Sequence, residues 1–319
     1  MYIFTKQNEL HNDYVKKNIY RFVLSSRDYE LYYKFKVGRG INIINNDNQE
    51  RTLFPIYLNN KIVSTFLVST FEGETSGIYS KAYSEQLDKL KYFTNINNPL
   101  ILTTFDDDLW GIIGKRAYSL NEQKNIIYNK KINTNELVIL NGNENIKYDK
   151  NFVSLRSPSG YVLNFDIKYI QPSGKSRCYS YALSNILYNL GYNWHTPETI
   201  SSYFNYEDGV SFKELSSYLN NYNFSNDAKD SGYLFKGEVI EQIYYKNRYI
   251  LIGGTNTSSN GQHALVIFGY NNTNNTYSFW NPWYNFTQYM DMDSKLINTK
   301  SSTVYKWNAG YIKNIGKIK

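Results

Sequence analysis

The sequence predicts an α+β protein in two parts, a β-rich N-terminal domain and a second domain in which helices precede strands. Residues 1–140 contain short alternating or apolar runs separated by Asn, Gly and Asp, which is the pattern of strands and turns. A polar stretch with Gly, Pro and Ser follows, and it has the composition of a linker. Beyond it, an apolar stripe at helical spacing leads into further helical patterns and then into apolar runs of strand length. We expect domains at residues 1–145 and 166–319, joined by a linker and activation segment at 146–165.

The N-terminal domain is expected to consist mainly of strands, which lie in KFKVGRGINIINN, LFPIYLNNKIVSTFLVSTF and LWGIIGKRAYSL. Asn59 and Asn60 in the second stretch predict a hairpin turn. One helix is expected in SKAYSEQLDKLKYF, where apolar residues fall on one face. His11 lies in a polar N-terminal segment, and we expect it to be exposed with a structural role. No group of residues in this domain indicates chemistry of its own.

Composition narrows the class of protein. Of the 319 residues, 41% are hydrophobic, which is enough for a packed core. The net charge of +7 is spread as +3 over residues 1–150 and +4 over the rest, so no basic block indicates a nucleic-acid partner. No apolar run is long enough to cross a membrane, and we expect no membrane association. The N-terminus lacks the apolar centre of a signal peptide.

Cys178 is the only cysteine of the chain, which rules out an internal disulfide and a cysteine-rich metal site. It begins the predicted helix CYSYALSNILYNLG, which Gly191 is placed to end. The first turn of a helix carries unpaired backbone N–H groups and the positive end of the helix dipole, and both lower the pKa of a thiol. A single cysteine is also commonly a small buried apolar residue. The position of Cys178 alone therefore does not decide between a catalytic nucleophile and a buried core residue.

The rest of the second domain is expected to contain two more helices and four strands. The helices lie in TPETISSYF, where Thr196 is a cap and Pro197 the first helical residue, and in SFKELSSYLNNY. The strands lie in RYILIGGT, HALVIFGY, TYSFWN and SSTVYKWNAGYI. Gly253 and Gly254 in the first strand either let a substrate backbone approach closely or mark a turn at the strand end.

A cysteine nucleophile needs a base nearby and a third group that orients the base. His195 lies beyond the far end of the Cys178 helix, roughly 20 Å away at about 1.5 Å per residue, which leaves His263 as the candidate base. A turn centred in NNTN would place His263 opposite Asn281, whose side-chain oxygen can accept the imidazole N–H. Trp283 would shield that hydrogen bond from water. Taken alone, the pair of His263 and Asn281 is best interpreted as a core histidine beside a turn asparagine. Together with Cys178 and Trp283, the pair favours catalysis.

Three stretches, QPSGKSRCYSYALSNIL, GQHALVIFGY and WNPW, together resemble the papain-like cysteine peptidases and are most similar to the staphopain family. The order in which Gln, Cys, His and Asn follow one another along the chain is the same as in this family. By position, the resemblance implies Cys178 as nucleophile, His263 as base and Asn281 as the residue that orients it. Gln171 would form the oxyanion hole with the Cys178 N–H, although it stands seven residues before Cys178, where six is usual. Tyr179 stands where Trp is common in the wider papain group.

The resemblance covers about residues 160–319 and implies a fold as well as a reaction. The implied fold class is α+β, a papain-like peptidase domain with a helical part and an antiparallel β part, preceded by a β-rich pro-domain. Residues 1–145 would be an inhibitory propeptide that occupies the cleft. The chain would then be the zymogen of a bacterial enzyme, activated by cleavage in the segment between the domains.

The expected reaction is hydrolysis of peptide bonds in a peptide or protein substrate, without a cofactor and without a metal. We expect a secreted monomer whose signal peptide lies outside this sequence, with a cytoplasmic location as the alternative. A dedicated protein inhibitor is a further candidate partner. Two other functions stay open: acyl transfer to an amine by the same triad, as in transglutaminase-like or toxin enzymes, and a non-catalytic binding module.

Overall fold

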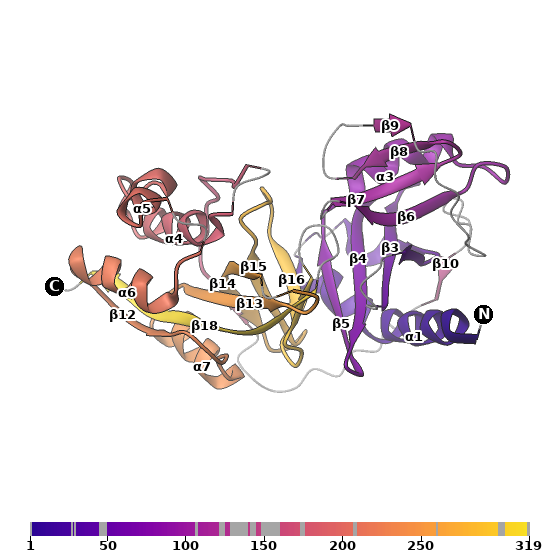
Figure 1. The fold of residues 1–319 in the computed structure, drawn as a ribbon. Helices are drawn as coiled ribbons and strands as arrows, with labels where there is room; N and C mark the ends of the chain where they lie inside the picture. The colour runs from indigo at the N-terminus through magenta and orange to yellow at the C-terminus, as the bar shows by residue number, and fades with distance from the viewer. Residues whose placement is uncertain are drawn as a thin grey trace. The chain divides into compact units, whose positions relative to one another are not determined.

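The computed structural model divides the chain into two compact units (Figure 1). Unit 1 comprises Met1–Val153 and Asn298–Val304, and unit 2 comprises Ser154–Ile297 and Tyr305–Lys319. Most of the expected linker, residues 148–159, lies outside the residues that the structure describes. The described residues are 2–26, 28, 30–44, 50–105, 108–120, 125–127, 140, 145–147, 160–172, 176–206, 209–259, 261–298 and 304–317.

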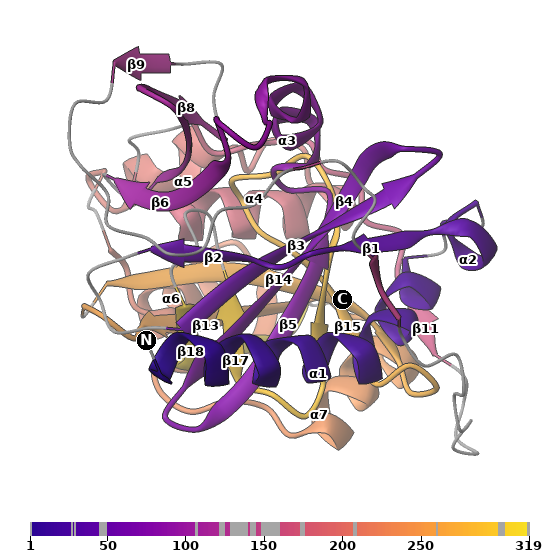
Figure 2. The same cartoon turned by 90° about the vertical axis from the view of Figure 1, so that its right-hand side faces the viewer.

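Unit 1 begins with a helix that the sequence pattern did not lead us to expect. α1 (Tyr2–Ser25) buries His11, Val15, Ile19 and Phe22, which recur every three or four residues and therefore share one face. This face packs against strands β3, β4 and β5 (Figure 2). His11 is fully buried, so the expectation that it is exposed is wrong.

The strands of unit 1 form a mixed sheet arrangement. β10, β1, β3, β4 and β5 pair antiparallel in that order. β2 pairs antiparallel with β3 and parallel with β6, and β6 is followed by β7, β8 and β9 in antiparallel pairings. The strand bounds are β1 Lys36–Gly38, β2 Ile41–Ile44, β3 Glu50–Leu58, β4 Lys61–Phe71, β5 Glu74–Ser80, β6 Leu100–Phe105, β7 Asp108–Ile113, β8 Arg116–Ser119, β9 Asn125–Ile127 and β10 Asn145–Ile146.

Local signals predicted several elements of unit 1 correctly. Asn59 and Asn60 connect β3 to β4 with φ angles of 49° and 66°, the left-handed values that a two-residue hairpin turn requires. The expected helix over SKAYSEQLDKLKYF is present in shorter form as α3 (Ser84–Leu90) and the one-turn helix η1 (Lys91–Phe93). A further short helix, α2, spans Leu31–Lys34.

The first helix of unit 2, α4 (Cys178–Asn189), ends as the sequence predicts. Gly191 has a φ of 90°, and its N–H donates to the carbonyl of Tyr188, while the Tyr192 N–H donates to the carbonyl of Leu187. These two bonds form a Schellman motif, which satisfies carbonyls at the end of the helix. The glycine therefore fixes how far the Cys178 helix runs.

Two further helices of unit 2 lie in the predicted segments, and both begin at capping residues, of which Thr196 was predicted. At α5 (Pro197–Tyr203), the Thr196 side chain accepts the Thr199 N–H at 3.2 Å. At α6 (Phe212–Asn221), Ser211 and Glu214 form a reciprocal capping box. The short helices α7 (Lys236–Ile240) and η2 (Glu241–Tyr245) follow later in the chain.

The strands of unit 2 form an antiparallel sheet in the order β12, β18, β13, β14, β15 and β16, and β11 pairs with β14. β13 and β14 lie in the middle, and most of their side chains are buried. α4 packs on β14, which brings the start of that helix to the sheet. The strand bounds are β11 Tyr161–Val162, β12 Phe224–Lys229, β13 Ile250–Asn256, β14 Gln262–Asn271, β15 Thr276–Trp280, β16 Gln288–Asp291, β17 Leu296–Asn298 and β18 Val304–Lys317.

The predicted fold class, an α+β papain-like domain with a helical part and an antiparallel β part, is wrong. Strands account for 41% of the described residues and helices for 28%, and the parallel pairing of β2 with β6 makes the sheet of the chain mixed. The apolar stripes predicted real helices, but α4, α5 and α6 have only 12, 7 and 10 residues. Helices of this length cover parts of a sheet and do not form a separate helical half.

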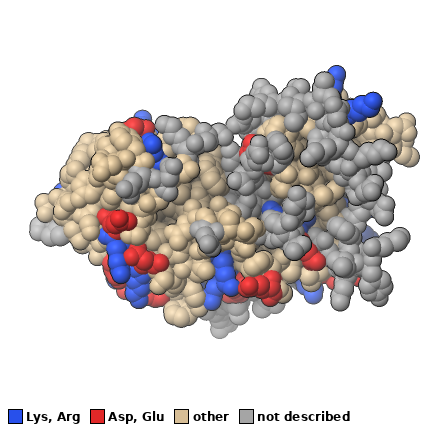
Figure 3. Space-filling view, in the orientation of Figure 1, with Lys and Arg blue, Asp and Glu red and all other residues tan. Residues whose placement is uncertain are grey.

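Charge is dispersed over the visible face of the molecule, where the described basic and acidic residues are intermixed (Figure 3). This distribution agrees with the even spread of charge along the sequence. Among the described residues, none of the helices has the length and hydropathy needed to cross a bilayer.

Candidate active site

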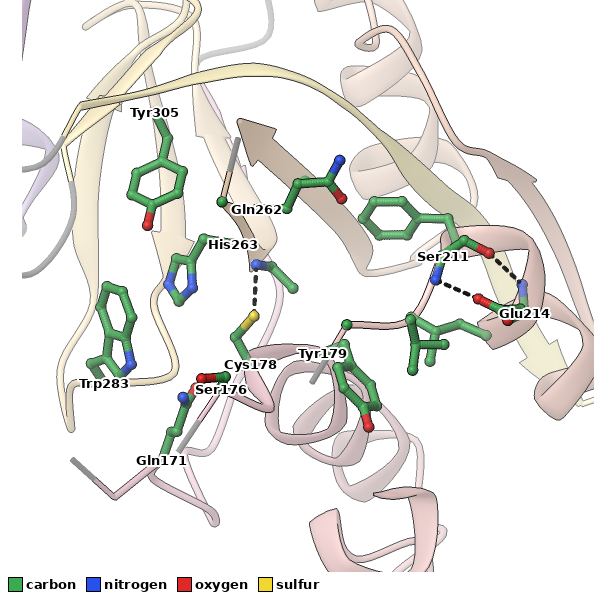
Figure 4. Close-up of a pocket in the computed structure, with 17 residues that line it drawn as sticks. Gln171, Ser176, Cys178, Tyr179, Ser211, Glu214, Gln262, His263, Trp283 and Tyr305 are labelled. Atoms are coloured by element: carbon green, nitrogen blue, oxygen red, sulfur yellow. Dashed lines mark hydrogen bonds between the residues drawn. The ribbon is translucent and has the colours of Figure 1, made fainter. Parts of the chain in front are cut away.

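Unit 2 contains a cavity of about 710 Å³ that brings most of the predicted catalytic residues together. Gln171, Cys178, His263 and Trp283 all line it (Figure 4). They come from the segment before α4, the first turn of α4, the start of β14 and the segment after β15. Residues far apart in the sequence therefore meet at one concave surface.

Cys178 is the first residue of α4 and is partly exposed at the cavity. Its Sγ accepts a hydrogen bond from the Ala264 N–H at 3.3 Å. Burial raises the pKa of the thiol, and hydrogen bonds from the backbone N–H groups of Ala264, Tyr179 and Cys178 itself act in the opposite direction. The helix N-terminus was expected to lower this pKa, but desolvation of the sulfur outweighs it. The resting side chain is therefore a neutral thiol.

His263, the second residue of β14, is 3% exposed. Its Nε2 lies 3.0 Å from Asn281 Oδ1, and the Trp283 N–H donates to the same oxygen at 3.2 Å. Because this amide oxygen is an acceptor, Nε2 carries the proton and Nδ1 is left as the basic nitrogen. Burial lowers the pKa of His263 to about 4, and the hydrogen bond that Nε2–H donates to Asn281 partly opposes this shift. The resting imidazole is neutral, in the tautomer that a general base requires.

The hydrogen bond between His263 and Asn281 exists, but the register that predicted it is wrong. β14 pairs Val266 with Trp280, and β15 ends at Trp280, so Asn281 lies beyond the strand. The register differs by two residues from the expected one, and its continuation would place Trp283 opposite His263. A shift of two residues keeps side chains on the same face of the sheet. Asn281 therefore reaches the imidazole as a diagonal neighbour.

Two aromatic rings contact the imidazole of His263. The Trp283 ring stacks on it with 3.9 Å between centroids and an interplanar angle of 16°, and the Tyr305 ring lies at 5.6 Å and 48°. The stacking of Trp283 agrees with the expected shielding role. Tyr305 was not predicted, because it reaches the site only through the pairing of β18 with β13. Between them the rings restrict the orientation of the imidazole.

Gly253 and Gly254 lie within β13 and have a packing role that the sequence did not suggest. A Cβ on Gly253 would lie 2.6 Å from the Phe212 ring, and a Cβ on Gly254 would lie 2.9 Å from the Cβ of Tyr305. Both contacts are closer than real Cβ atoms allow. The glycines therefore make room for two aromatic side chains that line the cavity, and neither marks a strand-end turn.

Gln171 is 4% exposed and lines the cavity together with Cys178. Its backbone N–H donates to the carbonyl of Pro282 at 2.8 Å, which joins this segment to the one that carries Asn281. Residues 173–175, between Gln171 and Cys178, lie outside the described residues. The position of Gln171 is compatible with an oxyanion hole, and that role stays a prediction.

His195 does not line the cavity, as its sequence position led us to expect. Its Nδ1 lies 2.6 Å from the hydroxyl of Tyr218, and its ring stacks on Trp194 with 3.5 Å between centroids. Burial lowers its pKa to about 4. His195 is a buried, neutral part of an aromatic cluster with a structural role.

Comparison of the chain with known proteins finds no matching family model and no similar curated protein. The functional class therefore depends on the residues themselves. A cysteine at a helix start, a buried histidine and an asparagine that fixes its tautomer are side chains that together can carry out thiol-dependent acyl transfer when a substrate is bound. Among the described residues, no group of three His, Cys, Asp or Glu side chains is placed to hold a metal ion.

We expect Asn281→Ala to lower kcat/KM for peptide hydrolysis by about 10- to 150-fold, the effect of one hydrogen bond to a group that becomes charged during the reaction. The cause is loss of the acceptor that orients His263. Asn285→Ala is the matched control, because Asn285 is an exposed asparagine in the same segment. Equal kinetics for the two variants would exclude an orienting role for Asn281.

Proposed function

We propose that this chain is the precursor of a secreted, staphopain-like cysteine endopeptidase that hydrolyses peptide bonds with Cys178, His263 and Asn281. The observation that carries the proposal is the 3.0 Å hydrogen bond between His263 Nε2 and Asn281 Oδ1 in a site that also holds the only cysteine of the chain. That bond has a specific chemical consequence, since it leaves Nδ1 free to take a proton. The proposal rests on this side-chain arrangement and not on the fold class.

The reaction begins with an uncharged thiol and an uncharged imidazole. His263 Nδ1 takes the thiol proton as Sγ attacks the scissile carbonyl carbon, and the electrons of the C=O bond move to oxygen. The Cys178 N–H and the Gln171 side chain stabilise this oxyanion, at about 3–4 kcal/mol per donor. The C–N bond then breaks and the imidazolium gives its proton to the leaving amine. Water, deprotonated by Nδ1, hydrolyses the thioester and restores both groups.

Burial disfavours a charge on Cys178 alone or on His263 alone, but it disfavours the thiolate–imidazolium pair of the two residues less. Transfer of the proton from sulfur to nitrogen leaves the net charge unchanged and creates two opposite charges close together. At about 4 Å and an effective dielectric constant of about 20, their attraction is about 4 kcal/mol. The hydrogen bond to Asn281 also favours the imidazolium form. The thiolate–imidazolium pair is therefore accessible from the neutral resting state.

Residues 1–145 are the proposed inhibitory pro-domain. They belong to unit 1, which is compact in itself, and the chain's only cysteine lies in unit 2. Activation would require cleavage between the units, within residues 146–165. The active protein would then be the part of the chain beyond the cut, which contains unit 2, released from inhibition and without a cofactor.

Labelling of the full chain before and after limited proteolysis tests the proposal. We expect a thiol-reactive epoxide to modify Cys178 faster once the segment between the units is cut, and the cut form to cleave peptides with a gain of one water in the product mass. Loss of ammonia with crosslinking would instead identify acyl transfer to an amine. Absence of any labelling of Cys178 in the cut form would exclude a catalytic thiol, and full activity of the uncut chain would exclude the pro-domain.

A further inference from the structure

The cavity at Cys178 has an apolar wall on the side of α6. Val210, Phe212 and Leu215 contribute to this wall, and Tyr179 of α4 lies beside it. Phe212 and Leu215 are buried and held by the helix, so the wall is part of the fold. It offers apolar contact to the aliphatic stem of a bound side chain.

Glu214 is the only formally charged residue among the described residues that line this cavity. Its Oε2 accepts the Ser211 N–H at 2.8 Å, and Ser211 Oγ accepts the Glu214 N–H at 3.2 Å, so the carboxylate is held in place at the start of α6. Hydrogen bonding of the carboxylate to Ser211, first of all to its backbone N–H, lowers the pKa of Glu214, and the group is ionised at neutral pH. In Figure 4, Glu214 and Cys178 lie on opposite sides of the cavity.

The charge of Glu214 is not balanced by a neighbouring cation among the described residues. The adjacent Lys213 instead lies 3.8 Å from Asp230. The hydrogen bonds that fix Glu214 use only one of its carboxylate oxygens, Oε2. The cavity therefore combines an apolar wall with one uncompensated negative charge, which attracts cations and repels anions.

We propose that this cavity selects peptide substrates that carry a Lys or Arg side chain near the scissile bond, with the aliphatic stem against the α6 wall and the cationic end at Glu214. This inference rests on the proposed peptidase function and adds the substrate class. A carboxylate near the wall contributes modestly to the binding of a cationic side chain where water has access, and it contributes more where the bound peptide excludes water. We expect Arg to be preferred over its uncharged isostere citrulline by about 5- to 20-fold in kcat/KM.

The test uses peptides that differ only by Arg or citrulline at one position, scanned through the residues on either side of the scissile bond. The enzyme is the full chain after limited proteolysis, as wild type and as Glu214→Gln. Glutamine preserves the capping box, so the variant removes the charge and keeps the helix start. Glu198→Gln is the matched control, because Glu198 lies in the first turn of α5 and does not line the cavity.

The inference requires that Arg is preferred over citrulline at one peptide position. This preference should disappear in Glu214→Gln, remain in Glu198→Gln and weaken with added salt. Cleavage of both peptides at equal rates would overturn the inference and leave the proposed function standing. An Arg preference that survives in Glu214→Gln would also overturn it, since the charge would then lie elsewhere. If no peptide is cleaved and Cys178 is not labelled, the proposed function and the inference fail together.

Discussion

Replacement of Cys178 by Ala is expected to lower peptide hydrolysis by the cleaved protein by about 10⁴- to 10⁶-fold, the range seen when single members of a catalytic triad are removed. No other residue can supply the attacking sulfur, because Cys178 is the only cysteine of the chain. Cys178→Ser should be nearly as inactive, since a hydroxyl is a far weaker nucleophile at neutral pH. The measurement is kcat/KM on a peptide that the wild type cleaves.

The same substitution has a small, separable effect on stability. Cys178 Sγ accepts the Ala264 N–H, and alanine leaves that donor without its partner, at a cost of about 1–3 kcal/mol. The melting temperature should therefore fall slightly while activity disappears. If Cys178→Ala retains peptide hydrolysis, the thiol is not the nucleophile. If the variant is unfolded, the His263→Gln variant provides a second test of the same chemistry.

Elements with local signals could be predicted from the sequence, and the arrangement of those elements could not. Thr196, Ser211 and Gly191 fix helix ends through hydrogen bonds to neighbouring residues, so their effects can be deduced from a short window. The fold class depends on which strands pair across long separations. The parallel pairing of β2 with β6, for example, joins segments almost sixty residues apart and leaves no local pattern.

The candidate site shows the same division between local and distant information. Cys178 could be identified from its residue type and its place at the start of a helix, and His263 by elimination of the other histidines. Neither inference depends on the register of paired strands. A turn centred one residue too early in NNTN gives a register that differs from the observed one by two residues. The contact between His263 and Asn281 is retained because a shift of two residues keeps side chains on the same face of the sheet. Tyr305 could not be found, since β18 approaches His263 only through its long-range pairing with β13.

α1 is the clearest case of a helix whose signal in the sequence is weak but present. His11, Val15, Ile19 and Phe22 recur at helical spacing and all are buried. The many polar residues between them made the segment resemble an irregular terminus. An amphipathic helix needs only one apolar face, and here a buried histidine forms part of it.

The second large effect is expected in unit 1, where His11 should make stability sensitive to acid. Its Nδ1 lies 2.7 Å from Thr52 Oγ1, and its Nε2 lies 3.0 Å from Thr70 Oγ1. The Thr52 hydroxyl donates its proton to Asn42 Oδ1, so it accepts from Nδ1–H. The neutral ring then accepts the Thr70 hydroxyl proton at Nε2. A proton on Nε2 would break this bond as well as place a charge in the core.

Burial lowers the pKa of His11 from 6.5 to about 4, which sets the direction of the effect. Below pH 6.5 the unfolded chain binds a proton at this position and the folded chain does not, so acid favours unfolding. The stability present above pH 6.5 is lost as the pH falls toward 4, by at most roughly 3 kcal/mol. This corresponds to about a hundredfold change in the unfolding equilibrium.

Hydrogen exchange of peptides from α1, β3 and β4, measured between pH 7 and pH 4 and corrected for intrinsic exchange, reports the stability of unit 1. His11→Gln should be less stable than the wild type at pH 7 because it loses hydrogen bonds, and it should show a smaller loss of protection on acidification. The matched control is His195→Gln, since His195 is a buried histidine of unit 2 with its pKa also lowered to about 4. That variant should leave the acid response of unit 1 unchanged. An unaltered acid response in His11→Gln would show that the proton responsible binds elsewhere.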